Sequence, residues 1–119
     1  MNKIIAAFLM IVNLSVAQAD EYVKRNGVLS LFLNNGIAEF NINASHGKAS
    51  GVCNIDGTAR AVSAAEGQRN RWVYGDSSSA CVAVISELSD GSVNVMTRSC
   101  ENYCGISAVG SMDGKYRIK

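Results

Sequence analysis

The sequence predicts an all-β fold: a single small antiparallel β-barrel or β-sandwich of about seven to eight strands, held together by disulfides. Three observations lead to this prediction. Apolar and polar residues alternate over short segments, as they do in half-buried strands. Glycine, asparagine and aspartate punctuate these segments, and no proline is present to build the turns. Four cysteines lie in a chain too short to bury a large core.

The first pair of strands has the clearest pattern. A leucine stands at every second position from 29 to 33, and an apolar residue stands at every second position from 38 to 42. Asn34-Asn35-Gly36 separates the two runs, and these residue types tolerate the backbone angles of tight turns. The pattern predicts a β-hairpin with a short turn.

Further strands are expected wherever β-branched and aromatic residues gather between turn residues. They are Gly51–Ile55, Thr58–Val62, Arg71–Tyr74, Cys81–Ile85, Val93–Thr97 and Lys115–Ile118. The turns expected between them contain Asp56-Gly57, Asp76–Ser79, Asp90-Gly91 and Asp113-Gly114. The segment Ala59–Gln68 has alanines but no wide apolar stripe, so we expect a loop or a short helix there.

Aromatic and branched side chains are expected to form the core, with one face of each strand left polar. The expected core residues are Phe40, Ile42, Trp72, Tyr74, Val82, Val84, Val93, Val95, Tyr116 and Ile118. The single tryptophan can serve either as a core anchor or as a platform for a ligand, and a strand position in a small β domain favours the core.

The amino terminus has the pattern of an export signal. Lys3 precedes an apolar run from Ile4 to Val12, and Ala17-Gln18-Ala19 supplies small residues at a cleavage point. We therefore expect residues 1–19 to be a cleaved signal peptide and residues 20–119 to be one β domain. The apolar run is too short to span a bilayer, so we expect a periplasmic or secreted protein without membrane insertion.

All four cysteines lie downstream of this signal, where an oxidising compartment favours disulfides. The four residues Cys53, Cys81, Cys100 and Cys104 allow three pairings. We predict Cys53 with Cys81, joining two strands, and Cys100 with Cys104, closing a short ring. A zinc site is the alternative for four cysteines, but the chain has neither a C-x2-C pair nor a second histidine.

Charge and motif content narrow the functional classes. Without Lys3, ten basic side chains balance ten acidic ones, and they form no basic face for a nucleic-acid partner. The only histidine, His46, lies in a polar turn, and the carboxylates show no spacing typical of a glycosidase pair. Phosphate-binding and metal-binding loop motifs are absent from the sequence, so we expect a non-enzymatic protein without a cofactor.

Binding is the remaining class, and the region from Cys100 to Cys104 suits it. A short ring there would present Glu101, Asn102 and Tyr103, which offer an acceptor, an amide and an aromatic side chain. A loop held in its bound shape loses less entropy on docking. The alternative is a tied-down strand connection with no partner.

The order of cysteines, glycines and aromatic residues resembles that of small exported proteobacterial proteins of the lysozyme-inhibitor type. The resemblance covers most of Gly36–Arg117. The segments that carry it are Cys53-Asn-Ile-Asp-Gly-Thr-Ala, Trp72-Val-Tyr, Cys81-Val-Ala-Val, Cys100-Glu-Asn-Tyr-Cys104-Gly105 and Met112-Asp-Gly-Lys-Tyr116. The chain is also similar to periplasmic immunity proteins of type VI secretion systems, which protect their owner from a peptidoglycan-cleaving toxin.

Both resemblances imply one mode of action, in which a β domain plugs the cleft of a secreted muramidase. Muramidases hydrolyse glycosides with carboxyl groups in a deep cleft, so side-chain donors on the inhibitor are expected to face them. The expected donors are His46, Lys48, Asn102 and Tyr103, while Glu101 and Asp76 are expected to pair with a basic rim. The alternatives are a structural or adhesin-like envelope module, and a small-molecule binder or enzyme. Exposed strand edges would also allow a homodimer.

Overall fold

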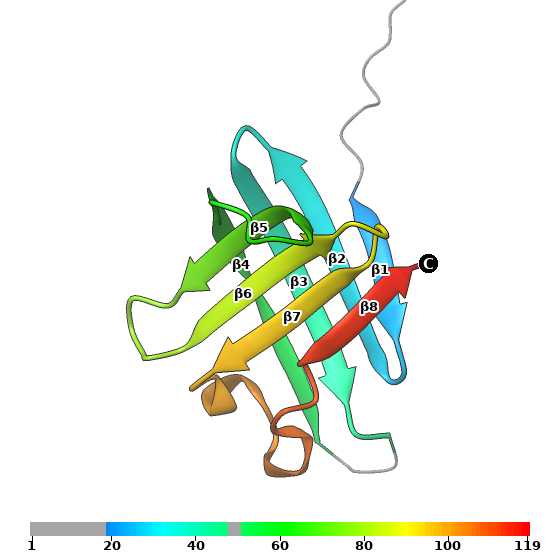
Figure 1. Ribbon diagram of the computed structural model, residues 1–119. Helices are drawn as coiled ribbons and strands as arrows, with labels where there is room; N and C mark the ends of the chain where they lie inside the picture. The colour runs from blue at the N-terminus through cyan, green and yellow to red at the C-terminus, as the bar shows by residue number, and fades with distance from the viewer. Residues whose placement is uncertain (1–18, 48–50) are drawn as a thin grey trace, which may run out of the picture.

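The computed structural model describes residues 19–47 and 51–119, so most of the expected signal peptide and Lys48 lie outside the described residues. Eight strands form one closed antiparallel barrel, in which each strand pairs with the next and β8 returns to β1 (Figure 1). The strands are β1 (Asp20–Lys24), β2 (Gly27–Asn34), β3 (Ile37–Ser45), β4 (Val52–Val62), β5 (Gln68–Gly75), β6 (Val82–Leu88), β7 (Val93–Arg98) and β8 (Gly114–Ile118). The all-β prediction is confirmed, and the fold is a barrel rather than a sandwich.

The hairpin of β2 and β3 is the one predicted from the alternating pattern. Leu29 pairs with Ile42 and Leu31 with Phe40, and all four are buried in the barrel interior, whereas Leu33 beside the turn is exposed. Asn35 and Gly36 form the turn, with φ angles of 50° and 83°. Asparagine and glycine reach these left-handed angles at the least steric cost, which is why this pair forms the turn.

The predicted turn at Asp56-Gly57 is wrong, because β4 runs without interruption through both residues. The glycine serves a packing role instead of a turn. A Cβ atom on Gly57 would lie 2.5 Å from Cε1 of Tyr74, so the missing side chain makes room for the tyrosine ring. Beyond Gly57 the strand continues to Val62, with Ala59 fully buried. Of the segment Ala59–Gln68, residues 63–67 form the predicted loop and the remainder is strand.

The sequence pattern does not predict β1. β1 contains three charged residues in five, and only Tyr22 faces the core. A single inward residue produces no visible alternation, so the pattern gives no signal. The strand nevertheless closes the barrel, because Tyr22 pairs with Leu29 of β2 on one side and with Ile118 of β8 on the other. The strand edges that suggested a homodimer are therefore paired within the chain here.

Most of the predicted core is confirmed. Phe40, Ile42, Trp72, Val93, Val95 and Tyr116 are buried, and Tyr74 is half-buried with its ring edge-on to Phe40 at 5.3 Å.

The prediction fails in β6 and at the end of β8. Val82 and Val84 face outward, while Ala83 and Ile85 of the same strand face inward. Every residue from 81 to 85 is apolar, so no alternation indicates which face is buried. Strand pairing determines which residues face inward, because Ile85 lies opposite the buried Trp72. Ile118 is 66% exposed, since it lies at the last position of its strand.

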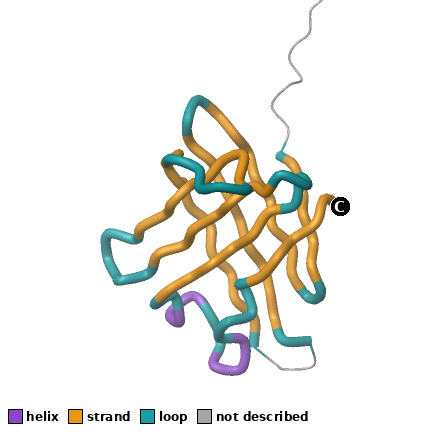
Figure 2. The backbone as a smooth tube through the Cα atoms, viewed as in Figure 1, coloured by secondary structure: helices purple, strands orange, loops and turns teal. Residues whose placement is uncertain are grey.

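Alternate strand connections lie at opposite ends of the barrel (Figure 2). Residues 99–113 connect β7 to β8 and form the longest connection between described strands. We call this segment the anchored loop. It contains two 3-10 turns, η4 (Glu101–Tyr103) and η5 (Ile106–Ala108), and lies at the same end as the β3–β4 and β5–β6 connections.

Candidate functional site

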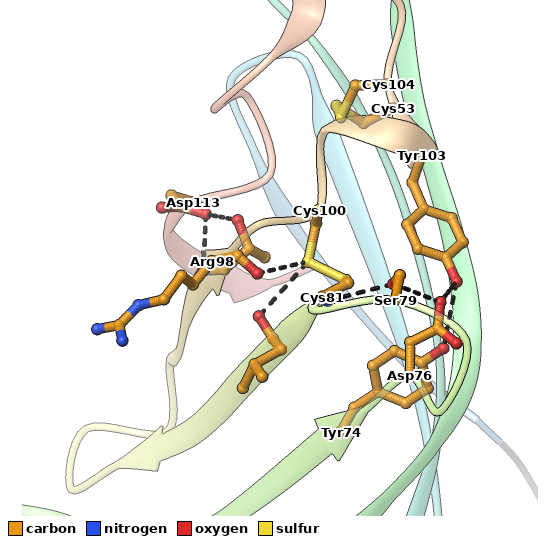
Figure 3. Close-up of a disulfide and its surroundings, with 12 residues drawn as sticks. Cys53, Tyr74, Asp76, Ser79, Cys81, Arg98, Cys100, Tyr103, Cys104 and Asp113 are labelled. Atoms are coloured by element: carbon orange, nitrogen blue, oxygen red, sulfur yellow. Dashed lines mark hydrogen bonds between the residues drawn. A yellow bond between two sulfur atoms is a disulfide. The ribbon is translucent and has the colours of Figure 1, made fainter.

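Both disulfides attach the anchored loop to the barrel. Cys104 is bonded to Cys53 at the start of β4, and Cys100 is bonded to Cys81 just before β6. The predicted pairs, Cys53–Cys81 and Cys100–Cys104, are wrong. Figure 3 shows the two bridges on either side of η4, so the loop is held at two separate points. The disulfides indicate an oxidising compartment.

Strand register explains the observed pairs. Val82 and Arg98 are partners in the β6–β7 hairpin, and Cys81 and Cys100 lie just beyond them, with Cα atoms 4.4 Å apart. Cys53 and Cys104 form an isolated antiparallel bridge, so the loop briefly pairs with β4. Closeness along the chain misled the prediction, because the η4 turn separates the two neighbouring cysteines.

Backbone hydrogen bonds extend the attachment to β4. The Gly105 amide donates to the Val52 carbonyl at 2.9 Å, and the Gly51 amide donates to Ser107 Oγ at 2.8 Å. The two glycines pass at close range, since a Cβ atom on Gly105 would lie 3.0 Å from Gly51 Cα. The residues on both sides of Ile106 are therefore fixed.

The second half of the loop closes this end of the barrel. Ala108, Ser111 and Met112 are buried, and the Tyr116 hydroxyl donates to the Met112 carbonyl at 2.8 Å. His46, on the β3–β4 connection, lies 3.0 Å from the Val109 carbonyl through Nε2. Because a carbonyl oxygen only accepts, Nε2 carries the proton in this contact. The loop thus contacts the β3–β4 connection at His46 and strand β8 at Tyr116.

A cluster of hydroxyl and carboxylate groups ties η4 to the β5–β6 connection. The Tyr103 hydroxyl donates to Asp76 Oδ2 at 2.5 Å. The same carboxylate accepts from the Ser78 amide at 2.9 Å and from the hydroxyls of Ser78 and Ser79 at 2.8 and 2.9 Å. Figure 3 shows Tyr103, Asp76 and the Tyr74 ring lying together. We call the Asp76–Tyr103 contact the latch.

The latch changes the acidity of both partners. The hydrogen bond from Tyr103, followed by those from Ser78 and Ser79, holds the pKa of Asp76 well below its ordinary value. The hydrogen bond to Asp76, followed by the contact with Tyr74, raises the pKa of Tyr103 well above its ordinary value. The donor therefore keeps its proton and the acceptor stays ionised across the whole neutral range.

Replacing Asp76 by asparagine is expected to reduce the acid sensitivity of the fold. Asp76 has a lowered pKa in the folded protein, so the stability it contributes is fully present above its unfolded pKa, near 3.8, and is lost as the pH falls below that value. Melting temperatures of wild type and D76N at pH 7, 4, 3 and 2 check this, and the wild type should lose more. D56N is the control, since the exposed Asp56 lies in β4 and its carboxylate accepts no hydrogen bond from the described residues. Parallel curves for wild type and D76N would contradict the prediction.

Five of the six predicted contact residues lie in the described part of the chain, and all five are at the anchored end. Asp76 and Tyr103 meet in the latch, where both are half-buried and hold the loop to the β5–β6 connection. Glu101 and Asn102 are exposed on η4, and His46 is exposed beside the loop. Lys48 lies outside the described residues.

Ile106 is a candidate contact residue that the sequence pattern did not predict. Its side chain is 96% exposed at the start of η5. Two exposed valines lie close by: Val52, whose carbonyl accepts from the Gly105 amide, and Val109, three residues further along the chain. The chain offered only a weak signal, namely an isoleucine between the small residues Gly105 and Ser107 directly after a cysteine. Its exposure depends on how the loop is attached, which the residue types do not reveal.

A basic depression adjoins the loop. It has a volume of about 570 Å³, lies between the β1–β2 and β3–β4 connections, and is lined by Lys24, Arg25, Asn26, Ser45, His46 and Gly47. The anchored end therefore carries basic side chains on one side and the acidic Glu101 on η4.

All four cysteines are oxidised in disulfides, so none offers the thiolate that zinc would require. Within residues 19–47 and 51–119, no helix has the length and apolar character needed to cross a membrane. Comparisons with protein-family models, curated proteins and solved structures give no match for this chain.

Proposed function

We propose that the protein is exported to the periplasm, or beyond it, and inhibits a peptidoglycan-cleaving muramidase by inserting the anchored loop into the enzyme's cleft. One observation carries the proposal. The loop is fixed by two disulfides and by the latch, although a connection between two adjacent strands requires only a short turn. Fixing a longer surface loop at three points suits a loop that must keep its shape against a partner.

Rigidity supports inhibition through entropy. Ordering a flexible side chain at an interface costs about 0.5–1.5 kcal/mol, and ordering a loop costs more. The anchored loop has met that cost on folding, so more of its contact energy appears as affinity. A fixed loop with exposed residues at one end of the barrel also suits the concave cleft in which glycosidases keep their carboxyl groups.

Exposed polar groups around the loop provide complementary contacts. The Asn102 amide can donate to a carboxylate in the cleft, and Glu101 can pair with basic side chains at its rim. The neighbouring basic depression, with Lys24 and Arg25, can pair with an acidic rim. Such contacts promote encounter and orientation more than final affinity.

Titration of muramidases with the purified, oxidised protein starting at Asp20 tests the proposal. The panel holds lysozymes of the C, I and G types and the muramidase effectors encoded by the same genome, assayed for lysis of peptidoglycan. We expect at least one enzyme to lose its activity at near-stoichiometric ratios. Lysozymes and effectors form separate arms, so the result also distinguishes defence against a host enzyme from immunity to a toxin.

Reduced and alkylated protein is the control, since it keeps the sequence but loses both attachments of the loop. It should inhibit much less than the oxidised form. Full activity of every enzyme in the panel at a several-fold excess of oxidised protein would refute the proposal.

A further inference from the structure

Ile106 is the most exposed of the large hydrophobic residues in the described part of the chain. Its side chain is 96% exposed, whereas the others with exposed side chains range from 40% to 66%. A single exposed apolar side chain is common on protein surfaces. Ile106 differs from such residues because a disulfide and backbone hydrogen bonds hold the loop around it.

The backbone on both sides of Ile106 is held in place. Cys104 is fixed by its disulfide, and Gly105 by its hydrogen bond to Val52. Ala108 is fully buried, and its amide donates to the Gly105 carbonyl at 2.8 Å, which closes the η5 turn. Isoleucine is β-branched and has few χ1 rotamers, so its direction is set by this backbone.

The surroundings of Ile106 are mainly polar or small. Gly105 and Ser107 flank it in the chain, and the exposed Glu101 and Asn102 lie on the preceding turn. The exposed Val52 and Val109 are its apolar neighbours. A highly exposed apolar side chain bordered by polar residues is the arrangement of an interface anchor that enters one pocket of a partner.

We propose that Ile106 enters the pocket in which a muramidase binds the methyl of an N-acetyl group of its glycan substrate. This inference rests on the proposed function. The glycan is rich in hydroxyls, and its N-acetyl methyls are among its few apolar groups, so a cleft that binds it needs apolar pockets for these methyls beside the polar groups that orient the sugar. A highly exposed, branched aliphatic side chain bordered by polar residues likewise places an apolar group among polar ones. The anchored loop thus offers the enzyme an apolar group among polar groups, as the amino sugar does.

Replacing Ile106 by serine tests the inference on the enzyme that the wild type inhibits. Burial of an isoleucine side chain corresponds to about a 10- to 100-fold change in affinity, so I106S should raise the inhibition constant by that factor. I118S is the matched control, because Ile118 is also an exposed isoleucine but lies at the end of β8, near the opposite end of the barrel. It should inhibit like the wild type. Both variants should keep the wild-type melting temperature.

A second measurement identifies the pocket. With methyl-labelled inhibitor in complex with the enzyme, the Ile106 methyl resonance should shift on binding. The N-acetylglucosamine trimer should return it to its free position, while the deacetylated trimer at equal concentration should not.

The outcomes separate the two proposals. Failure of the wild type to inhibit any enzyme in the panel overturns both. Inhibition by I106S within about twofold of the wild type, or a methyl resonance that the acetylated trimer leaves unchanged, overturns the inference about Ile106 and leaves the proposed function standing.

Discussion

Replacing Cys53 and Cys104 together by serine is expected to lower the free energy of unfolding by about 4 kcal/mol. The bond closes a segment of 51 residues, and a cross-link over a long segment removes much of the conformational entropy of the unfolded chain. Cys53 is also fully buried, beside the Ser111 hydroxyl at 3.4 Å. Urea denaturation followed by tryptophan fluorescence measures the change, since Trp72 is buried in the core.

The second disulfide provides the comparison. Cys81 and Cys100 are separated by 19 residues, so the same entropic relation gives about 3 kcal/mol for the C81S/C100S variant. The order of the two losses is therefore part of the prediction. A larger loss from C81S/C100S than from C53S/C104S would show that unfolded-chain entropy is not the dominant contribution of these bonds.

Replacing Tyr116 by alanine is expected to cost about 3–5 kcal/mol, the range for removing a large aromatic side chain from a core. Tyr116 is fully buried, and it links the barrel interior to the anchored loop through its bond to the Met112 carbonyl. The Lys24 ammonium also lies over its ring, 5.6 Å from the centroid. Thermal and urea unfolding measure the loss.

Two variants of the same strand separate the contributions. Y116F keeps the ring but leaves the Met112 carbonyl without its donor, which is expected to cost about 1–3 kcal/mol. I118A removes aliphatic atoms from an exposed side chain two residues later and is expected to change stability by less than about 0.5 kcal/mol. A loss from I118A as large as that from Y116A would contradict the described burial of β8.

The parts of the fold that could be predicted are those in which the residues that determine an element lie close together in the chain. The β2–β3 hairpin was readable because side-chain alternation and turn residues lie within a few positions of each other. At Gly57 the turn residues led to a wrong prediction, because this aspartate–glycine pair lies inside a strand, where the glycine leaves space for a packed ring. The Tyr74 ring that needs its space comes from another strand. Such a contact has no trace in the neighbouring sequence.

The cysteines of the anchored loop were expected to form disulfides, and they do, but the predicted ring from Cys100 to Cys104 is wrong. The partners of these cysteines depend on strand register, which places Cys81 and Cys53 beside the loop. The latch and the exposure of Ile106 follow from that register, so they were out of reach of residue types and spacing alone.

The two bridges differ in how much of the polypeptide must already be native before their sulfurs can meet. Cys81 and Cys100 flank one hairpin, so a newly made chain needs only β6 and β7 paired to oxidise them. Cys53 and Cys104 need β4 and the end of the barrel in place, so their bond is expected to mark completed assembly. A ring joining the neighbouring Cys100 and Cys104 would be a competing early product. Undoing it would require thiol–disulfide exchange, and rapid maturation in the cell would then depend on a disulfide isomerase.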